Sequence, residues 1–181
     1  ESDLVKITDE VQVRMVSPTV KVLSNIDGSK NQIDAAFDTI RDCITERVKE
    51  FVYGDCGISD EMELELVSSW ANLHKKGDFA QVHAHYNSII SGVWYLTTTP
   101  KTGKLVVHSD HKLFGNLLDF PKRVYNDNYS FTPRNGDLLI FPSTLKHSVT
   151  HNEVDIERYS IAFNYMVRGD VINGRETKVK L

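Results

Sequence analysis

The chain has 181 residues, of which 40% are apolar and 25% charged, and its net charge is −4. This balance is typical of one folded domain and excludes a disordered, collagen-like or coiled-coil chain. The acidic net charge argues against general nucleic-acid binding, and no apolar run approaches the roughly 18 residues of a membrane-spanning helix.

The two cysteines, Cys43 and Cys56, are too few for a disulfide scaffold or a four-thiolate zinc site. We interpret both as free thiols in a reducing compartment. The first residues, Glu1 to Leu4, lack the charged-then-apolar pattern of a signal peptide. These features predict a cytoplasmic protein, in the host cytoplasm if a phage encodes it.

The first part of the chain predicts two short strands, Val11 to Val16 and Val20 to Leu23, followed by one long amphipathic helix. Between Gly28 and Gly54, apolar residues recur at steps of three and four, which is the period of a helix with one buried face. The residues of that face are Ile33, Ala36, Phe37, Ile40, Ile44, Val48, Phe51 and Val52.

After Ser59 the chain changes to short strand-like runs separated by Gly, Pro, Asn and Asp turns. The predicted strands are Met62 to Trp70, Phe79 to Tyr86, Ser91 to Thr98, Lys104 to His108, Asp137 to Phe141, Ser148 to His151 and Arg158 to Val167. So many short strands predict a mainly β protein, best fitted by a double-stranded β-helix (jelly roll) with the helix packed outside one sheet. We expect a single domain over 1–181, with the first strands and the helix in 1–60 and a metal-binding core in 61–168.

The run from Phe79 to Tyr86 contains a His-x-His pair. Side chains alternate along a strand, so Gln81, His83 and His85 are predicted on one face, with small apolar residues on the other. Two imidazoles one pleat apart can hold a single metal ion. An isolated pair of this kind is more often without function, so further residues are needed.

Those residues come later in the chain. His147 follows the apolar strand that ends at Pro142, far enough along for the chain to cross the sandwich and return. In the last predicted strand, Arg158, Ser160, Ala162 and Asn164 share one face, opposite an apolar face. An inward-pointing arginine and serine are costly unless they meet an anion or another partner, and together they form a good carboxylate receptor.

The order and spacing of these motifs resemble the Fe(II)- and 2-oxoglutarate-dependent dioxygenases, nearest the prolyl 4-hydroxylase-like group and a bacterial and phage branch of it. In that family a His-x-Asp pair and a distal His hold iron in a jelly roll, and Arg-x-Ser follows about 10 residues later. The resemblance covers roughly 70–167. The matching residues here are His83, His85, His147, Arg158 and Ser160.

The resemblance implies iron(II) as cofactor, 2-oxoglutarate as co-substrate, O2 as oxidant, and Arg158 with Ser160 holding the distal carboxylate of 2-oxoglutarate. It also implies that Tyr95, Ser91 and Asn164 line the same pocket. The substrate would be a peptide, a protein or a small molecule, for example a peptidyl proline that is hydroxylated. Weaker candidates for contact with the substrate are Gln81, Asn87 and Trp94.

One residue departs from the family pattern, because His85 stands where the family usually has Asp. His85 either replaces the carboxylate in a three-histidine site, or is itself the first ligand with Asn87 at the carboxylate position, or only two histidines bind. We favour the three-histidine site, since His83 and His85 share a predicted face. A neutral third ligand leaves the iron site one unit more positive.

Two alternatives remain open. The literal His-x-Asp of His108 and Asp110 ranks second as the ligand pair, because it follows the strand that it should precede; His74, His111 and His151 are interpreted as solvated loop residues. At the level of function, the rivals are a three-histidine metal cupin enzyme that does not use 2-oxoglutarate and a metal-free jelly-roll binding module. The sequence indicates no oligomeric state.

Overall fold

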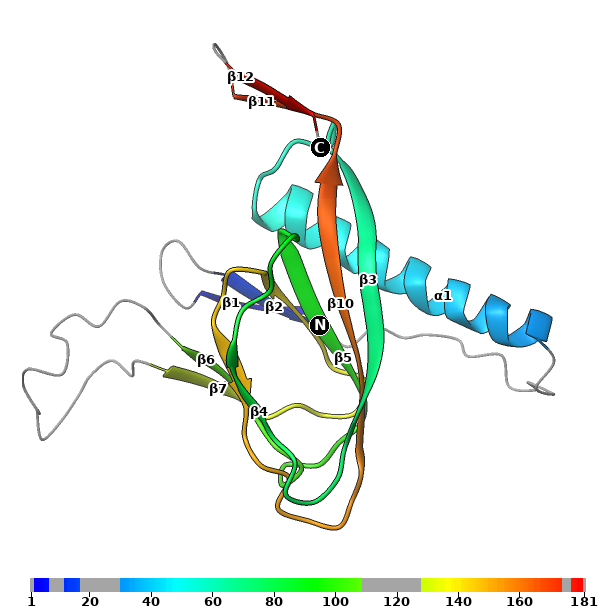
Figure 1. The fold of residues 1–181 in the computed structure, drawn as a ribbon, viewed down its shortest axis with the longest axis vertical. Coiled ribbons are helices and arrows are strands. Elements are labelled where there is room, and N and C mark those ends of the chain that lie inside the picture. Colours follow the sequence, from blue (N-terminus) through cyan, green and yellow to red (C-terminus); the bar gives the residue numbers. More distant parts are fainter. Residues whose placement is uncertain (1, 7–11, 17–29, 109–127, 174–176, 181) are drawn as a thin grey trace, which may run out of the picture.

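The computed structural model describes residues 2–6, 12–16, 30–108, 128–173 and 177–180. Its main feature is a pair of antiparallel sheets (Figure 1). The six-stranded sheet has the order β1-β2-β8-β5-β10-β3, and the four-stranded sheet has the order β4-β9-β6-β7. The strands are β1 (Ser2–Lys6), β2 (Gln12–Val16), β3 (Glu63–His74), β4 (Ala80–His83), β5 (Ile90–Thr97), β6 (Leu105–His108), β7 (Asn128–Phe131), β8 (Leu138–Pro142), β9 (His147–Val149) and β10 (Arg158–Arg168), with a separate hairpin of β11 (Asp170–Asn173) and β12 (Thr177–Lys180).

One long helix, α1 (Lys30–Lys49), continues into a π-helical segment, η1 (Glu50–Asp55), and covers the six-stranded sheet (Figure 1). Its apolar face packs against alternate side chains of the central strands β5, β8 and β10. This layer contains Ile44, Val48, Phe51, Val52, Ile90, Trp94, Leu138, Ile140, Phe163 and Tyr165. The predicted jelly roll with an outer helix is confirmed.

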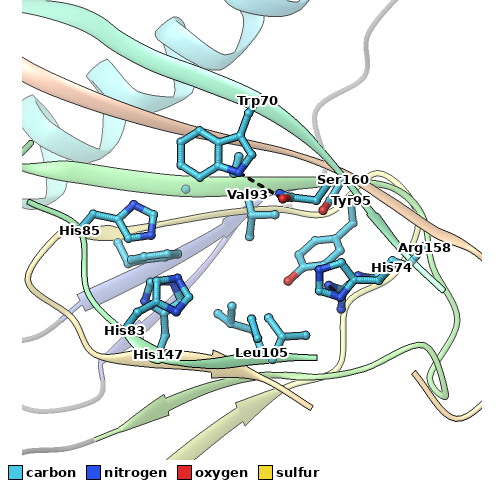
Figure 2. Close-up of a pocket in the computed structure, with 16 residues that line it drawn as sticks. Trp70, His74, His83, His85, Val93, Tyr95, Leu105, His147, Arg158 and Ser160 are labelled. Carbon is cyan, nitrogen blue, oxygen red and sulfur yellow. Dashed lines mark hydrogen bonds between the residues drawn. The ribbon is translucent and has the colours of Figure 1, made fainter. Parts of the chain in front are cut away.

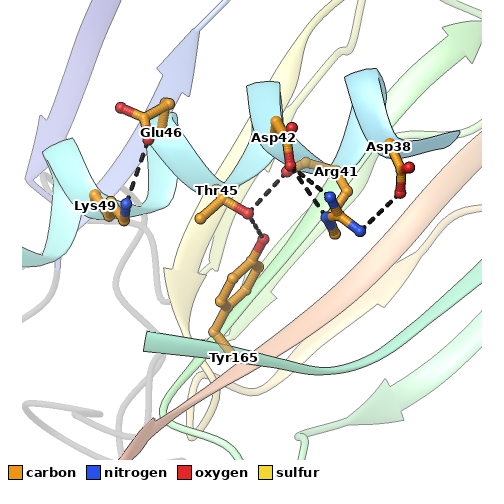
Figure 3. Close-up of polar contacts among 7 residues, drawn as sticks. All are labelled: Asp38, Arg41, Asp42, Thr45, Glu46, Lys49 and Tyr165. Carbon is orange, nitrogen blue, oxygen red and sulfur yellow. Dashed lines mark hydrogen bonds and ion pairs between the residues drawn. The ribbon is translucent and has the colours of Figure 1, made fainter. Parts of the chain in front are cut away.

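A polar contact adds to this helix–sheet packing (Figure 3). The hydroxyl groups of Thr45 on α1 and Tyr165 on β10 lie 2.7 Å apart and are hydrogen-bonded. Charged side chains stay on the solvent side of the helix, where Arg41 pairs with Asp38 at 2.8 Å. The helix is therefore held on the sheet by apolar burial and by the hydrogen bond between Thr45 and Tyr165.

The opposite face of the six-stranded sheet packs against the four-stranded sheet. Here the alternate residues of β5 and β8, Tyr95, Leu139 and Phe141, meet residues of β6 and β7. Because neighbouring side chains on a strand point to opposite faces, β5 and β8 supply both hydrophobic layers. Their nearly continuous apolar sequence follows from this burial on two sides.

The predicted elements differ from the structure mainly at their ends. The strand predicted to end at Trp70 continues to His74, and the one predicted over Phe79 to Tyr86 ends at His83. The short strands β1, β7, β11 and β12 lack a clear apolar alternation and were not predicted. The predicted strand Val20 to Leu23 lies outside the described residues.

The two cysteines are free thiols, as predicted, and burial raises the pKa of each. In the part of the chain that the structure describes, no helix combines the length and apolarity needed to cross a membrane.

Candidate metal centre and anion pocket

Three histidines converge at one end of a pocket between the two sheets (Figure 2). His83 ends β4 and His147 begins β9, and the two residues are direct partners in the antiparallel pairing of these strands. His85 follows β4, and its backbone N–H donates to the carbonyl of Ser143 at 2.9 Å. The three rings offer one nitrogen each within 4.8 Å of one another. This spacing suits three ligands of a single ion.

The hydrogen bonds on the other ring nitrogens determine which nitrogen is free to bind. The Nδ1 atom of His83 lies 2.7 Å from the carbonyl oxygen of Gln81, and Nδ1 of His147 lies 2.9 Å from that of Leu145. Nδ1 of His85 lies 2.6 Å from Oδ1 of Asn164. These oxygens only accept, so each Nδ1 carries the proton and each Nε2 keeps its lone pair.

The charge state of the most buried ring also favours metal binding. Burial lowers the pKa of His147 to about 4, against the opposing effect of its bond to the Leu145 carbonyl, and the nearby His83 and His85 lower it further. The ring is therefore neutral at physiological pH. A neutral imidazole is the form that binds a divalent transition-metal ion such as iron(II), since metal-binding histidines must be deprotonated on the coordinating nitrogen.

The predicted alternation along the first histidine strand was wrong in detail. The pairing of β4 with β9 shifts register between Ala80 and His83, so these two residues both line the pocket. Val82, predicted to face the core, is 54% exposed, and the side chain of Gln81 is exposed away from the pocket. A β-bulge of this kind inserts a residue and breaks the period of two. Gln81 contributes only its backbone carbonyl to the site.

A buried arginine occupies the other end of the pocket (Figure 2). Arg158, the first residue of β10, is 2% exposed. Its guanidinium donates to the carbonyl of Thr102 at 3.3 Å and to Nδ1 of His74 at 2.7 Å, while its Nε–H has no partner. Burial lowers the pKa of Arg158, but an arginine keeps its proton in proteins. A buried cation whose protein partners are both neutral fits an anionic ligand.

A glycine makes room for this guanidinium. Gly103 has a φ of +104°, a conformation that a residue with a side chain rarely adopts. A Cβ atom at this position would lie 3.0 Å from Nη1 of Arg158 and 2.5 Å from the carbonyl oxygen of Thr150. The loop before β6 therefore approaches the arginine more closely than any other residue type would permit.

The cavity between the two ends has a volume of about 110 Å³. Ser160 and Ala162 line it from β10, and Tyr95 lies between the histidines and Arg158 (Figure 2). Burial raises the pKa of Tyr95 to about 12, so its phenol stays protonated and can donate a hydrogen bond. Among the described residues that line the cavity, none carries a carboxylate.

Two residues predicted to line the co-substrate pocket lie elsewhere. Ser91 and Asn164 are buried behind His85 and do not line the cavity. The Ser91 hydroxyl donates to Oδ1 of Asn164 at 2.7 Å and lies 3.1 Å from Nδ1 of His85. Both side chains therefore contact a predicted ligand rather than the predicted co-substrate, and they do so because His85 sits past the end of β4.

Like Gln81, the candidates Trp94 and Asn87 for substrate contact lie outside the cavity. Trp94 is buried in the layer under α1, where its indole N–H donates to the carbonyl of Gly136 at 3.1 Å. Asn87 is exposed and lies in a bend, with a positive φ of 59°. The alternation along β5 explains Trp94, since Val93 and Tyr95 take the face toward the pocket.

Sequence reasoning missed a row of pocket residues on β3. Trp70, Asn72 and His74 are alternate residues of this strand, and all three line the cavity. They lie beside their pairing partners on β10, which are Ala162, Ser160 and Arg158. His74 was predicted to be a solvated loop residue, which is wrong. It ends β3 and accepts a hydrogen bond from Arg158, and burial, with the charge of Arg158, lowers its pKa. The signal was the spacing of two in Trp70-x-Asn72-x-His74.

The remaining histidines do not form a second cluster among the described residues. His108 does not line the pocket, and its Nε2 is hydrogen-bonded to the hydroxyl of Ser148 at 2.8 Å. Asp110, its partner in the alternative ligand pair, lies outside the described residues, as does His111. His151 is exposed, and its ring packs on Phe79.

The comparison with protein families decides the class of this site. Residues 68–164, more than half of the chain, match the family described as "Putative 2OG-Fe(II) oxygenase". The chain belongs to this family of oxygenases. The predicted enzyme class and its cofactors, iron(II) and 2-oxoglutarate, are therefore confirmed, and O2 is the oxidant expected of the class.

Solved structures share the fold of this oxygenase at low sequence identity. An oxidoreductase of the 2OG-Fe(II) oxygenase family from Burkholderia pseudomallei has a TM-score of 0.57 and 16% identity, with 91% of this chain and 71% of that chain covered. Iron-bound HygX from Streptomyces hygroscopicus has a TM-score of 0.51 and 10% identity, with 88% and 84% covered. The non-heme alpha-ketoglutarate-dependent epimerase SnoN from nogalamycin biosynthesis has a TM-score of 0.54 and 16% identity, with 92% and 65% covered. No curated protein matches in sequence.

Proposed function

We propose that this oxygenase holds iron(II) through the Nε2 atoms of His83, His85 and His147, and 2-oxoglutarate between that ion and Arg158. One observation carries the proposal. Three imidazoles fixed with free Nε2 atoms and one buried guanidinium without a carboxylate partner lie at opposite ends of the same cavity. The dicarboxylate 2-oxoglutarate has one end that chelates a metal and one end that needs a cation.

The polar residues at the arginine end of the pocket bind and orient 2-oxoglutarate in this arrangement. Arg158 and the Ser160 hydroxyl donate to the distal carboxylate, and His74 and Thr102 hold the guanidinium in place. The protonated phenol of Tyr95 supplies a further donor between the two ends. When bound, the iron supplies the redox chemistry, in which 2-oxoglutarate and O2 give succinate and CO2 while the substrate is oxidised.

The third ligand in this proposal is His85 rather than Asn87. Asn87 is exposed and outside the cavity, whereas a nitrogen of the His85 ring lies in the cluster. A histidine in place of the carboxylate adds no negative charge, so the site attracts the anionic co-substrate strongly. The same loss of charge weakens the electrostatic attraction for the metal ion itself.

The substrate side of the site is marked by Trp70. Trp70 is 41% exposed and lines the cavity, and its ring centre lies 5.9 Å from that of His85. A hydrogen bond from the indole N–H to Oδ1 of Asn72, at 3.1 Å, fixes its orientation (Figure 2). We propose that the substrate approaches along Trp70. The resemblance to prolyl 4-hydroxylases supports a peptidyl residue as the oxidised group, and a small molecule is the other substrate class.

The test is formation of succinate from 2-oxoglutarate by the protein with Fe(II), ascorbate and O2. We expect turnover in the unaltered protein, its loss in His147→Ala, and a strong loss in Arg158→Ala at low 2-oxoglutarate concentration. His151→Ala is the matched control and should keep full turnover, because His151 is exposed and outside the site. Tight iron binding without succinate formation would favour the metal cupin, and no iron binding would favour the binding module; either result overturns the proposal.

A further inference from the structure

The ligand that departs from the family pattern is supported by a cluster of polar side chains, which we call the Asn164 network. It consists of the buried residues Ser91, Ser143 and Asn164 and the exposed Ser68. Asn164 and Ser91 each contact His85, and the Ser91 and Ser143 hydroxyls lie 2.8 Å apart. Ser91 and Ser143 are fully buried, and Asn164 nearly so. Buried polar groups are costly unless every one is paired, so the directions of these hydrogen bonds are strongly constrained.

The directions can be followed from one end of the network to the other. Nδ2 of Asn164 donates to the Ser68 hydroxyl at 3.0 Å, and the Ser91 hydroxyl donates to Oδ1 of Asn164 at 2.7 Å. Oδ1 is therefore the acceptor that faces His85. Because Oδ1 only accepts, Nδ1 of His85 is the donor at 2.6 Å. Its Nε2 is then left with a lone pair, directed to the histidine cluster.

We propose that Asn164 is the positioning residue that makes His85 a metal ligand, and that its neutral amide keeps the metal site without a negative charge. The inference rests on the proposed function. In His83 and His147, Nδ1–H donates to a backbone carbonyl, which is present whatever side chain the neighbouring residue carries. His85 alone depends on a side chain, so a single substitution can remove or change its support.

The chemical identity of that side chain matters as well as its position. A carboxylate that accepts the N–H of a metal-binding histidine raises the basicity of the ring, whereas an amide fixes the orientation without adding charge. Asn164→Asp would place a negative charge behind His85, at the same distance and in nearly the same volume. The Ser68 hydroxyl can rotate to donate to the second carboxylate oxygen, so the network stays paired.

The first measurement is calorimetric titration with Ni²⁺, which binds to such ligands without turnover. We expect Asn164→Ala to lower the affinity about 10–100-fold, the usual effect of losing a histidine's supporting partner. Asn164→Asp should bind Ni²⁺ at least as tightly as the unaltered protein. Tyr165→Phe is the matched control: it removes a hydrogen bond from the next residue of β10, on the helix side, and should leave the affinity unchanged.

The second measurement needs no metal and separates positioning from a loss of folding. Imidazole ¹⁵N shifts in the metal-free protein should show His85 as the Nδ1–H tautomer, and Asn164→Ala should lose this preference while His147 keeps it. An Nε2–H tautomer of His85 in the unaltered protein would overturn the inference, as would an unchanged Ni²⁺ affinity in a folded Asn164→Ala variant. If the unaltered protein does not bind Ni²⁺ at all, the three-histidine metal site fails instead.

Discussion

At the scale of single residues, burial sets the protonation of His147. His147 is almost fully buried, and its pKa of about 4 compares with about 6.5 for an unfolded chain. Below pH 6.5 the unfolded state therefore binds the proton while the folded state does not, and stability falls as the pH falls toward 4. Above pH 6.5 the imidazole is neutral in both states, so His147 costs no stability there.

This leads to a prediction for the metal-free protein. Between pH 7 and pH 4, His147 should reduce the free energy of unfolding by about 3 kcal/mol, measured by urea titration at each pH. His147→Gln should remove that part of the pH dependence, and His151→Gln, at an exposed position, should not. The same pH dependence in His147→Gln and the unaltered protein would contradict this account.

Arg158 makes a second prediction at the residue scale, because its planar fork is already oriented. Its two terminal nitrogens are held by Thr102 and His74. Arg158→Lys keeps the charge but loses the paired donors, so the KM for 2-oxoglutarate should rise about tenfold or more, measured by succinate formation. Arg134→Lys, at a side chain that is 74% exposed, should change nothing. An unchanged KM in Arg158→Lys would show that the carboxylate binds elsewhere.

At the scale of elements, the strands with strong apolar patterns were predictable and the irregular ones were not. The helix follows from the three- and four-residue steps of its apolar residues, and β10 from its alternation of polar and apolar residues. The strands β5 and β8 follow from short apolar runs between turn residues. The register shift in β4 was not predictable, because a bulge leaves no mark on the apolar pattern. The role of His74 required the pairing of β3 with β10, which only the fold reveals. Arg158 and Ser160 were recognised because polar side chains on an inward face are unusual.

The docking of the helix gives a prediction at this scale. Phe51 is fully buried against the six-stranded sheet, so Phe51→Ala should lower the free energy of unfolding by about 3–5 kcal/mol. Phe37, on α1, is 62% exposed, and Phe37→Ala should cost less than about 0.5 kcal/mol. Denaturant unfolding of the two variants checks both values. Equal losses would mean that the helix does not pack on the sheet as described.

At the scale of the whole molecule, the fold explains why one cavity holds two unlike groups. The four-stranded sheet supplies His83 and His147, and the six-stranded sheet supplies Arg158, Ser160 and Tyr95. The histidines and the Arg158 guanidinium therefore line the same cavity between the two sheets, at its opposite ends. The early strand β2 pairs with β8 and so adds to the same six-stranded sheet. The single domain over 1–181 and the cytoplasmic location stay predictions.

The most direct test of the whole account is anaerobic titration of the protein with Fe(II) and 2-oxoglutarate, followed by the weak visible charge-transfer band of their chelate. We expect a band that saturates at one iron per chain, disappears in His147→Ala, and needs far more 2-oxoglutarate in Arg158→Ala. A band that persists unchanged in both variants, or iron binding with no band in the unaltered protein, would contradict it.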